Sequence, residues 1–264
     1  MAGPKESHDG RLVSQDRWKS GFRYWLCVSV AVLSATVLPF RAGHTKTLAE
    51  VAEAARTSVA GLFGSLELKS KSLEALPQWR RVLTNFLTER MAFSRCIADS
   101  TSCTAAALTN WRHLVHLADS LGPRQKLGTI NSYFNSWPYR QDRELYGLSE
   151  YWATPREFMS RAGDCEDYAI AKYFALREVG FGPDELRIVI LRDEIRNVSH
   201  AVLAAYLVED IVILDNLSNQ IVSHSRYKHY IPQYSMNETA RWTHVRETRR
   251  KERHVYRGLK ALKQ

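Results

Sequence analysis

Hydrophobic periodicity changes once along this chain, close to Gly180, and this change limits the fold more than any other feature. Before it, apolar residues recur at the three-and-four spacing of helices, as in Trp79, Val82 and Phe86. After it come three short apolar runs that are typical of interior strands, at 187–191, 200–207 and 211–215. Helices followed by strands predict an α+β fold, in which N-terminal helices and a central helix pack on an antiparallel sheet.

Prolines and glycines mark the ends of the expected helices, because proline suits a first helical turn and glycine a helix end. On this basis helices are expected from Pro77, across 108–121, from Pro123 to Ser136, from Pro155, and from the Gly163 turn to Gly180. Residues 47–68 are rich in alanine and predict a weaker helix that serves as a spacer. His113 and His116 share one helix, but without a third metal ligand nearby they are interpreted as ordinary histidines.

The N-terminal part has the layout of an export signal or a signal anchor. Residues 24–40 form a 17-residue run without charge, and five basic residues precede it. This length is at the lower limit for spanning a bilayer, and no clean cleavage site follows, so cleavage and anchoring both stay open. A buried hydrophobic helix is the alternative interpretation. Either form of the signal predicts that the rest of the chain lies outside the cytoplasm.

The formal net charge of +9 is concentrated near the C-terminus. Residues 246–264 contain eight basic and two acidic residues, which leaves +3 for the rest of the chain. We interpret this tail as a solvated or membrane-surface extension and expect no nucleic-acid partner. The sequence is therefore divided into an export segment, a helical spacer, a folded domain and a basic tail, at 1–45, 46–76, 77–245 and 246–264.

Two of the four cysteines are expected to form a disulfide. Cys96 and Cys103 bracket a short polar loop between two helical patterns, and an oxidising compartment would allow them to pair. Such a bond contributes about 2–3 kcal/mol to stability in the chain-entropy description. A metal site is the weaker alternative, because no second Cys/His pair at suitable spacing accompanies them. Cys27 lies in the apolar run, so Cys165 is left unpaired.

Cys165 lies where a glycine turn leads into the central helix. Backbone N–H groups at the start of a helix favour the thiolate, which is the nucleophilic form of cysteine. His200, at the head of an expected strand, is the best candidate for a general base. Asp215, at the end of the next strand, can orient the imidazole. These residues predict a Cys-His-Asp catalytic triad.

Two observations oppose this triad. A lone cysteine at a helix start is usually a small buried residue, and a histidine in a strand is usually a residue of the core. A tight turn at Glu209 and Asp210 would also place Ala204, rather than His200, opposite Asp215. The triad then requires a strong twist or a bulge in the hairpin.

Several blocks in order resemble the bacterial transglutaminase-like cysteine proteinases, whose best-known branch is the LapG-type periplasmic proteases. They are "EYWATPREF", "GDCEDYAIAKY", "LRIVIL", "HAVLA" and "ILDN", and the resemblance runs from about Trp79 to Trp242. It implies a papain-like or transglutaminase-like fold. It also implies that Cys165 is the nucleophile, His200 the general base and Asp215 the orienting residue.

Three carboxylates surround the thiol, at Asp164, Glu166 and Asp167, and they allow two interpretations. They are favoured at a helix N-terminus as capping and first-turn residues, without any ligand. Alternatively they bind Ca²⁺, which accepts several carboxylate oxygens and would reverse a local field that otherwise raises the pKa of the thiol. The LapG-type branch requires calcium, and the resemblance implies that these three residues are the ligands.

The sequence therefore predicts an exported cysteine endopeptidase that depends on calcium. By resemblance, its substrate is the N-terminal region of a large surface adhesin, and an inner-membrane receptor for cyclic di-GMP controls access to that substrate. Two alternatives stay open. The same triad can transfer the acyl group to an amine, as in a transglutaminase-type acyltransferase, or the domain can serve as a non-catalytic binding module.

Overall fold

The computed structural model describes residues 61–246. The apolar run at 24–40, most of the expected spacer and the tail from residue 247 onward lie outside the described residues. None of the helices within 61–246 combines the length and the hydropathy that are needed to cross a membrane. The export segment and the domain boundaries therefore stay predictions.

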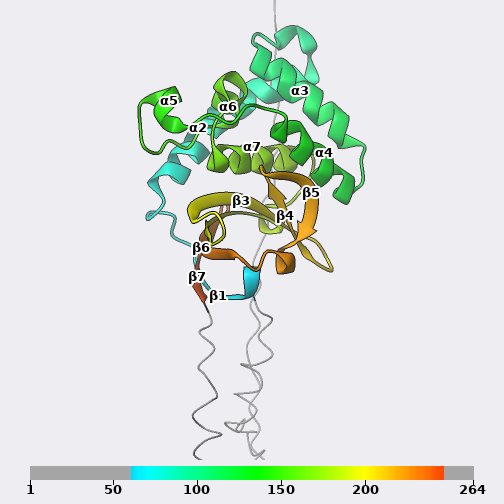
Figure 1. The fold of residues 1–264 in the computed structure, drawn as a ribbon. Coiled ribbons are helices and arrows are strands. Elements are labelled where there is room, and N and C mark those ends of the chain that lie inside the picture. Colours follow the sequence, from blue (N-terminus) through cyan, green and yellow to red (C-terminus); the bar gives the residue numbers. More distant parts are fainter. Residues whose placement is uncertain (1–60, 247–264) are drawn as a thin grey trace, which may run out of the picture. The chain divides into compact units, whose positions relative to one another are not determined.

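The helices expected from Pro77 onward are confirmed, and they lie on one side of a sheet (Figure 1). Proline occupies the first position of three of them, as expected for a residue without a backbone N–H. The short helix α5 was not predicted. The α-helices of the described residues are α2 (Pro77–Ala98), α3 (Ala106–Asp119), α4 (Pro123–Asn135), α5 (Asp142–Tyr146), α6 (Pro155–Arg161) and α7 (Cys165–Glu178).

The second layer is a seven-stranded antiparallel sheet with the order β1-β7-β6-β2-β3-β4-β5. Its strands are β1 (Ser65–Ser70), β2 (Leu186–Asp193), β3 (Val198–Tyr206), β4 (Ile211–Asp215), β5 (Ser218–Ser223), β6 (Tyr230–Met236) and β7 (Arg241–Arg246). The three apolar runs of the sequence correspond to β2, β3 and β4. Helices followed by an antiparallel sheet confirm the predicted α+β fold.

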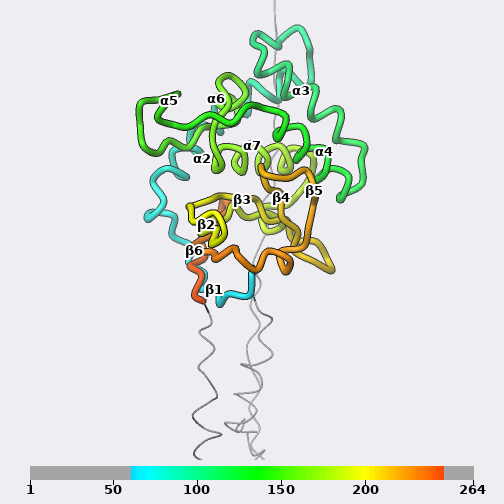
Figure 2. Tube along the Cα trace, in the orientation of Figure 1, coloured from blue at the N-terminus to red at the C-terminus, as the bar shows by residue number. Residues whose placement is uncertain are grey.

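Strand β1 corrects the predicted helix at 47–68, in the part of that range that the structure describes. Leu62–Gly64 form a 3-10 turn, and the next six residues pair with β7, from Ser65 opposite Arg246 to Ser70 opposite Arg241. Figure 2 shows these distant segments side by side. The helix prediction was wrong because pairing with a strand from the far end of the chain overrides local propensity. The sheet thus extends upstream of residue 77.

Alternate residues of the central strands face two separate cores. Ile188, Leu203 and Leu214 belong to the main core, which lies between the sheet and the helices. Val202 and Ile213 belong to a smaller core that contains Leu62 and Tyr230. This two-residue alternation is the expected pattern of a sheet covered on both faces. Helix α7 is buried along most of its length in the main core, which fixes the position of its N-terminus.

The register between β3 and β4 differs from the one that would have placed Ala204 opposite Asp215. Leu207 and Asp210 close a four-residue loop through a 2.8 Å backbone hydrogen bond, and Leu203 pairs with Leu214. Continued by one residue, this register brings Val202 opposite Asp215, with His200 two residues farther on the same face. The predicted pairing with Ala204 was wrong because the turn is centred on Val208 and Glu209, one residue earlier than the sequence analysis assumed.

The expected disulfide is present. Cys96, in the last turn of α2, is bonded to Cys103, which precedes α3, and their Cα atoms are 4.8 Å apart. Cys165 is the free cysteine of residues 61–246.

Candidate active site

Cys165 is the first residue of α7, and its side chain is half-buried. Asp167, in the first turn, closes the start of the helix, because its Oδ2 accepts the Asp164 N–H at 3.2 Å. Its Oδ1 accepts the Ala153 N–H at 2.6 Å and so ties the helix to the segment before α6. The Asp167 carboxylate therefore fixes the position of the sulfur relative to the surrounding loops.

Gly163 is required by the position of the Asp167 carboxylate. A Cβ atom at residue 163 would lie 2.1 Å from Asp167 Oδ2 and 2.6 Å from Asp167 Cβ. Real Cβ atoms do not approach other atoms so closely, so any larger residue would displace the carboxylate. The glycine in the "GDCEDY" stretch thus serves the close approach of a side chain to the backbone.

His200 and Asp215 form a buried pair at the ends of adjacent strands. The distance from His200 Nε2 to Asp215 Oδ1 is 2.9 Å, and the two residues are 4% and 1% exposed. An ionised carboxylate only accepts hydrogen bonds, so Nε2 carries the proton and Nδ1 is left as the acceptor. Burial would raise the pKa of Asp215, but the hydrogen bonds from His200, Tyr230 and the Leu217 N–H hold that pKa below its usual value.

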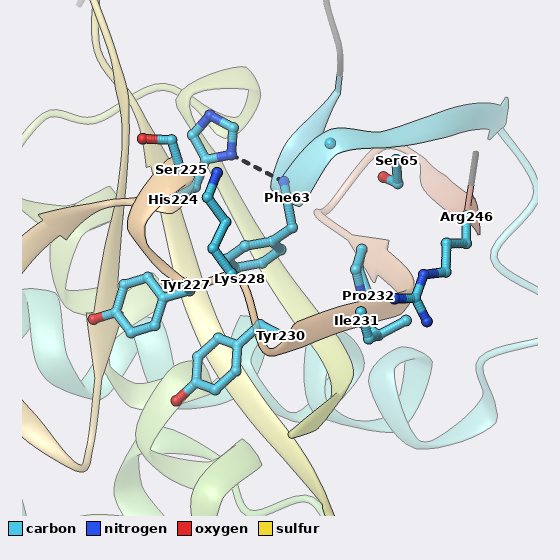
Figure 3. A pocket seen from close by; sticks show the side chains of 11 residues that line it. Phe63, Ser65, His224, Ser225, Tyr227, Lys228, Tyr230, Ile231, Pro232 and Arg246 are labelled. Atoms are coloured by element: carbon cyan, nitrogen blue, oxygen red, sulfur yellow. Dashed lines mark hydrogen bonds between the residues drawn. The ribbon is translucent and has the colours of Figure 1, made fainter. Parts of the chain in front are cut away.

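Tyr230, which the sequence analysis missed, completes the support of Asp215. Its hydroxyl donates to Asp215 Oδ2 at 2.7 Å, and its ring meets the His200 ring edge-on with centroids 5.9 Å apart. Tyr230 also lines a second cavity of about 360 Å³, in which the Phe63 N–H donates to His224 Nδ1 (Figure 3). No local motif marks Tyr230, because the contact depends on the pairing of β6 with β2.

Cys165 and His200 line one cleft of about 360 Å³. Ala201, next to His200, directs its backbone N–H toward the sulfur, which only partly opposes the rise in the pKa of the thiol that burial causes. Within residues 61–246, the hydrogen bond that the thiol itself donates goes to Glu166 Oε2, at 3.2 Å. The structure therefore brings the three predicted catalytic residues to one region, with Asp215 behind His200.

Negative charge dominates the electrostatics of this cleft. Burial, followed by the charges of Glu166 and Asp164, raises the pKa of the Cys165 thiol well above its ordinary value. Burial and the charge of Glu166 also raise the pKa of Asp164 to about 8. The same causes raise the pKa of Asp167, and burial raises that of Glu166. With protein atoms alone, this environment disfavours the thiolate.

Asp142 joins the predicted carboxylates, although it lies 22 positions before Asp164. A bridge between Tyr139 and Gly163, with the Arg140 N–H donating to the Gly163 carbonyl at 2.9 Å, brings the two segments together. One oxygen each of Asp142, Asp164 and Asp167 then lie within 4.8 Å of one another. Burial and the charge of Asp164 raise the pKa of Asp142 to about 6.

These carboxylates have the properties of a hard-cation site. Asp142 Oδ1 and Asp164 Oδ1 are both buried and have no hydrogen-bond partner within residues 61–246. Capping alone does not account for these oxygens, because a buried carboxylate oxygen without a partner is costly. Ca²⁺ binds several such oxygens at once. Glu166 lies with Asp164 and Cys165 in an adjoining group.

Comparisons with known proteins identify the family to which the chain is similar. A family model described as bacterial transglutaminase-like cysteine proteinase matches residues 91–250. The solved structure of Legionella pneumophila LapG is 32% identical, with 57% of this chain and 87% of that chain covered and a TM-score of 0.50. No curated protein matches the chain.

Two further solved structures are of the same Legionella pneumophila protein, one described as calcium-bound and the other as EGTA-treated. The calcium-bound form is 30% identical over 60% of this chain and 92% of that chain, with a TM-score of 0.51. The EGTA-treated form is 31% identical over 59% and 87%, also with a TM-score of 0.51.

Proposed function

The chain belongs to the bacterial transglutaminase-like cysteine proteinases and is a cysteine peptidase, and from this premise we propose that it is a calcium-dependent endopeptidase with Cys165 as nucleophile. His200 is the general base in this proposal, and Asp215 orients it. The strongest support is the buried His200–Asp215 hydrogen bond beside the cleft that contains Cys165. The resemblance of the sequence blocks supports the same three roles.

The His200 imidazole accepts and donates the protons in this mechanism. Because Asp215 holds the proton on Nε2 of His200, Nδ1 accepts the proton of the Cys165 thiol. The thiolate attacks the carbonyl carbon of a peptide bond, and the imidazolium then protonates the leaving amine. Water, deprotonated by the same imidazole, releases the acyl group and regenerates the thiol. The backbone N–H of Cys165, at the start of α7, is one donor to the developing oxyanion.

Asp142, Asp164 and Asp167 would hold the calcium ion, with Glu166 as the ligand nearest the sulfur. When bound, the ion supplies positive charge beside a thiol whose pKa is otherwise raised by carboxylates. Removal of Glu166 from its bond with the thiol would also free the sulfur to face His200. The carboxylates around the thiol then serve a metal that makes the thiolate accessible.

The substrate in this proposal is a cell-surface protein, and a large adhesin cleaved near its N-terminus is the substrate that the resemblance suggests. The predicted export segment supports a periplasmic location, with the possibility of an anchor at 24–40. Regulation by an inner-membrane receptor for cyclic di-GMP is proposed on the same resemblance. These three statements rest on the sequence.

The test is incubation of the purified protein with surface proteins of its own organism, with calcium or with chelator. We expect calcium-dependent fragments whose new termini can be sequenced by mass spectrometry, and no fragments with Cys165→Ala or His200→Ala. Crosslinked products instead of fragments would indicate an acyltransferase. Cleavage by Cys165→Ala at the wild-type rate would refute the proposal.

A further inference from the structure

The cavity that Tyr230 lines is separate from the catalytic cleft, and the proposed mechanism does not use it (Figure 3). Among the described residues, none lines both spaces. Tyr230 lies between them, because it lines the cavity while its hydroxyl donates to Asp215. A volume of about 360 Å³ is within the range of small-molecule sites. The cavity therefore has room for a ligand that is distinct from the substrate.

Aromatic side chains that contact one another line this cavity. The Phe63 ring meets the rings of Tyr227 and Tyr230 edge-on, with centroids 6.4 and 5.8 Å apart. The two tyrosine rings stack on each other, with centroids 4.8 Å apart. Ile231 and Pro232, in β6, add apolar surface. Aromatic rings pack well on the faces and edges of other rings, so this surface favours a ligand with a flat apolar body.

Phe63 keeps its ring in the cavity in spite of a strained backbone. Its φ of 54° lies in the left-handed region, which a bulky side chain rarely adopts and glycine adopts freely. The Phe63 N–H donates to His224 Nδ1 at 2.9 Å and holds the backbone in this conformation. Strained residues of this kind are found mainly at ligand sites and switches, because the conformation persists only where the surroundings maintain it. A phenylalanine at this position therefore indicates a use for its ring.

His224 and Lys228 supply hydrogen-bond donors to the same cavity. Because Nδ1 of His224 accepts the Phe63 N–H, the proton of the neutral imidazole is on Nε2. Within residues 61–246, this Nε2–H has no acceptor. Burial lowers the pKa of His224, and the charge of Lys228 lowers it further against the opposing charge of Asp210, so the ammonium group lies near the imidazole (Figure 3). An N–H donor beside an ammonium group favours an anion.

The charged side chains that line this cavity, among residues 61–246, are basic. They are Lys228 and Arg246, and the latter also pairs with exposed Glu194 at 3.2 Å. A smaller cavity of about 240 Å³, between α2 and α7, is apolar as well, but Glu178 and Glu238 are among its lining residues. An anion is therefore favoured in the first cavity and disfavoured in the second.

We propose that the cavity beside Phe63 binds a small organic anion with a flat apolar body, such as an aromatic carboxylate. The anionic group lies against His224 Nε2–H and the Lys228 ammonium, and the apolar body packs on the rings of Phe63, Tyr227 and Tyr230. The proposal does not depend on the proposed catalysis, because the lining residues include neither the triad nor the proposed calcium ligands.

The experiment measures the affinity of the full-length protein for naphthoate by isothermal titration calorimetry near neutral pH. Naphthamide serves as the neutral probe of the same shape. Lys228→Met removes the charge from the cavity, and Arg90→Met is the matched control, because Arg90 lines the smaller apolar cavity. Phe63→Leu removes the flat ring and keeps an apolar side chain. All proteins are measured in the same detergent, so that partitioning of the probes into it is common to every variant.

We expect the wild type to bind naphthoate about 10-fold more tightly than naphthamide, because only the carboxylate forms charge-assisted hydrogen bonds. Lys228→Met should remove most of this difference between the two probes. Phe63→Leu should weaken the binding of both probes about 5-fold, because each loses an aromatic contact. Arg90→Met should bind both probes as the wild type does.

The proposal is overturned if the wild type binds no naphthoate at about 1 mM, and this includes the case in which residues outside 61–246 fill the cavity. Equal affinities of the wild type for the two probes also overturn it. So does a loss of naphthoate binding in Arg90→Met that Lys228→Met does not show. Because Lys228 is exposed, its replacement leaves the core intact, and the comparison decides even if Phe63→Leu does not fold.

Discussion

Replacement of Tyr230 by phenylalanine tests the support of the proposed orienting carboxylate. The tyrosine hydroxyl provides the hydrogen bond to Asp215 Oδ2, at 2.7 Å, while Oδ1 accepts from His200 and Leu217. A hydrogen bond to a charged group contributes about 1.5–3 kcal/mol, and the remaining buried oxygen would lose its partner. If the whole of this loss is added to the activation free energy, the rate falls by about 10- to 100-fold.

Tyr227→Phe is the matched control. Its ring stacks on Tyr230 with centroids 4.8 Å apart, and within residues 61–246 no hydrogen bond joins it to Asp215. Urea unfolding should show a loss of about 1.5–3 kcal/mol for Tyr230→Phe and less than about 0.5 kcal/mol for the control. Cys165 alkylation and substrate cleavage should fall in the same order. Equal rates for the two variants would refute the role given to Tyr230.

Three other predictions follow from single contacts. Gly163→Ala should lower the unfolding free energy by about 2–4 kcal/mol in urea, since it displaces Asp167 from the helix start; a change below about 0.5 kcal/mol contradicts this. Asp142→Asn should weaken calcium binding about 10-fold or more by calorimetry, whereas exposed Asp184→Asn should not; equal affinities exclude Asp142 as a ligand. Burial lowers the pKa of His244 to about 4, so the unfolded state binds the extra proton between pH 4 and 6.5 and stability is lost as pH falls. His244→Gln should remove up to about 3 kcal/mol of this dependence from thermal scans at several pH values, and an unchanged slope would assign it elsewhere.

The sequence predicted most of the helical layer because its signals are local. Pro77 and Pro123 mark helix starts whatever the rest of the chain does, and the apolar runs from residue 187 onward form strands wherever they pair. The family resemblance then supported the roles of Cys165 and His200, which their positions at a helix start and a strand head had already suggested.

What the sequence did not predict depends on contacts between distant segments. Asp142 reaches Asp164 only through the bridge between Tyr139 and Gly163. Tyr230 meets Asp215 only after β6 has paired with β2. Strand β1 was misread for the same reason. Hydrophobic periodicity records which face of an element is buried, but not which element covers it.

The most direct measurement of the central claim is the rate of Cys165 alkylation by iodoacetamide from pH 5 to 9, with saturating calcium and with chelator. The carboxylates that raise the pKa of the thiol should make it slow without the metal. We predict that calcium restores rapid alkylation near pH 6, that chelator abolishes it reversibly, and that His200→Ala abolishes it even with calcium. The same slow, alkaline profile under all three conditions would contradict a calcium-dependent Cys-His-Asp peptidase.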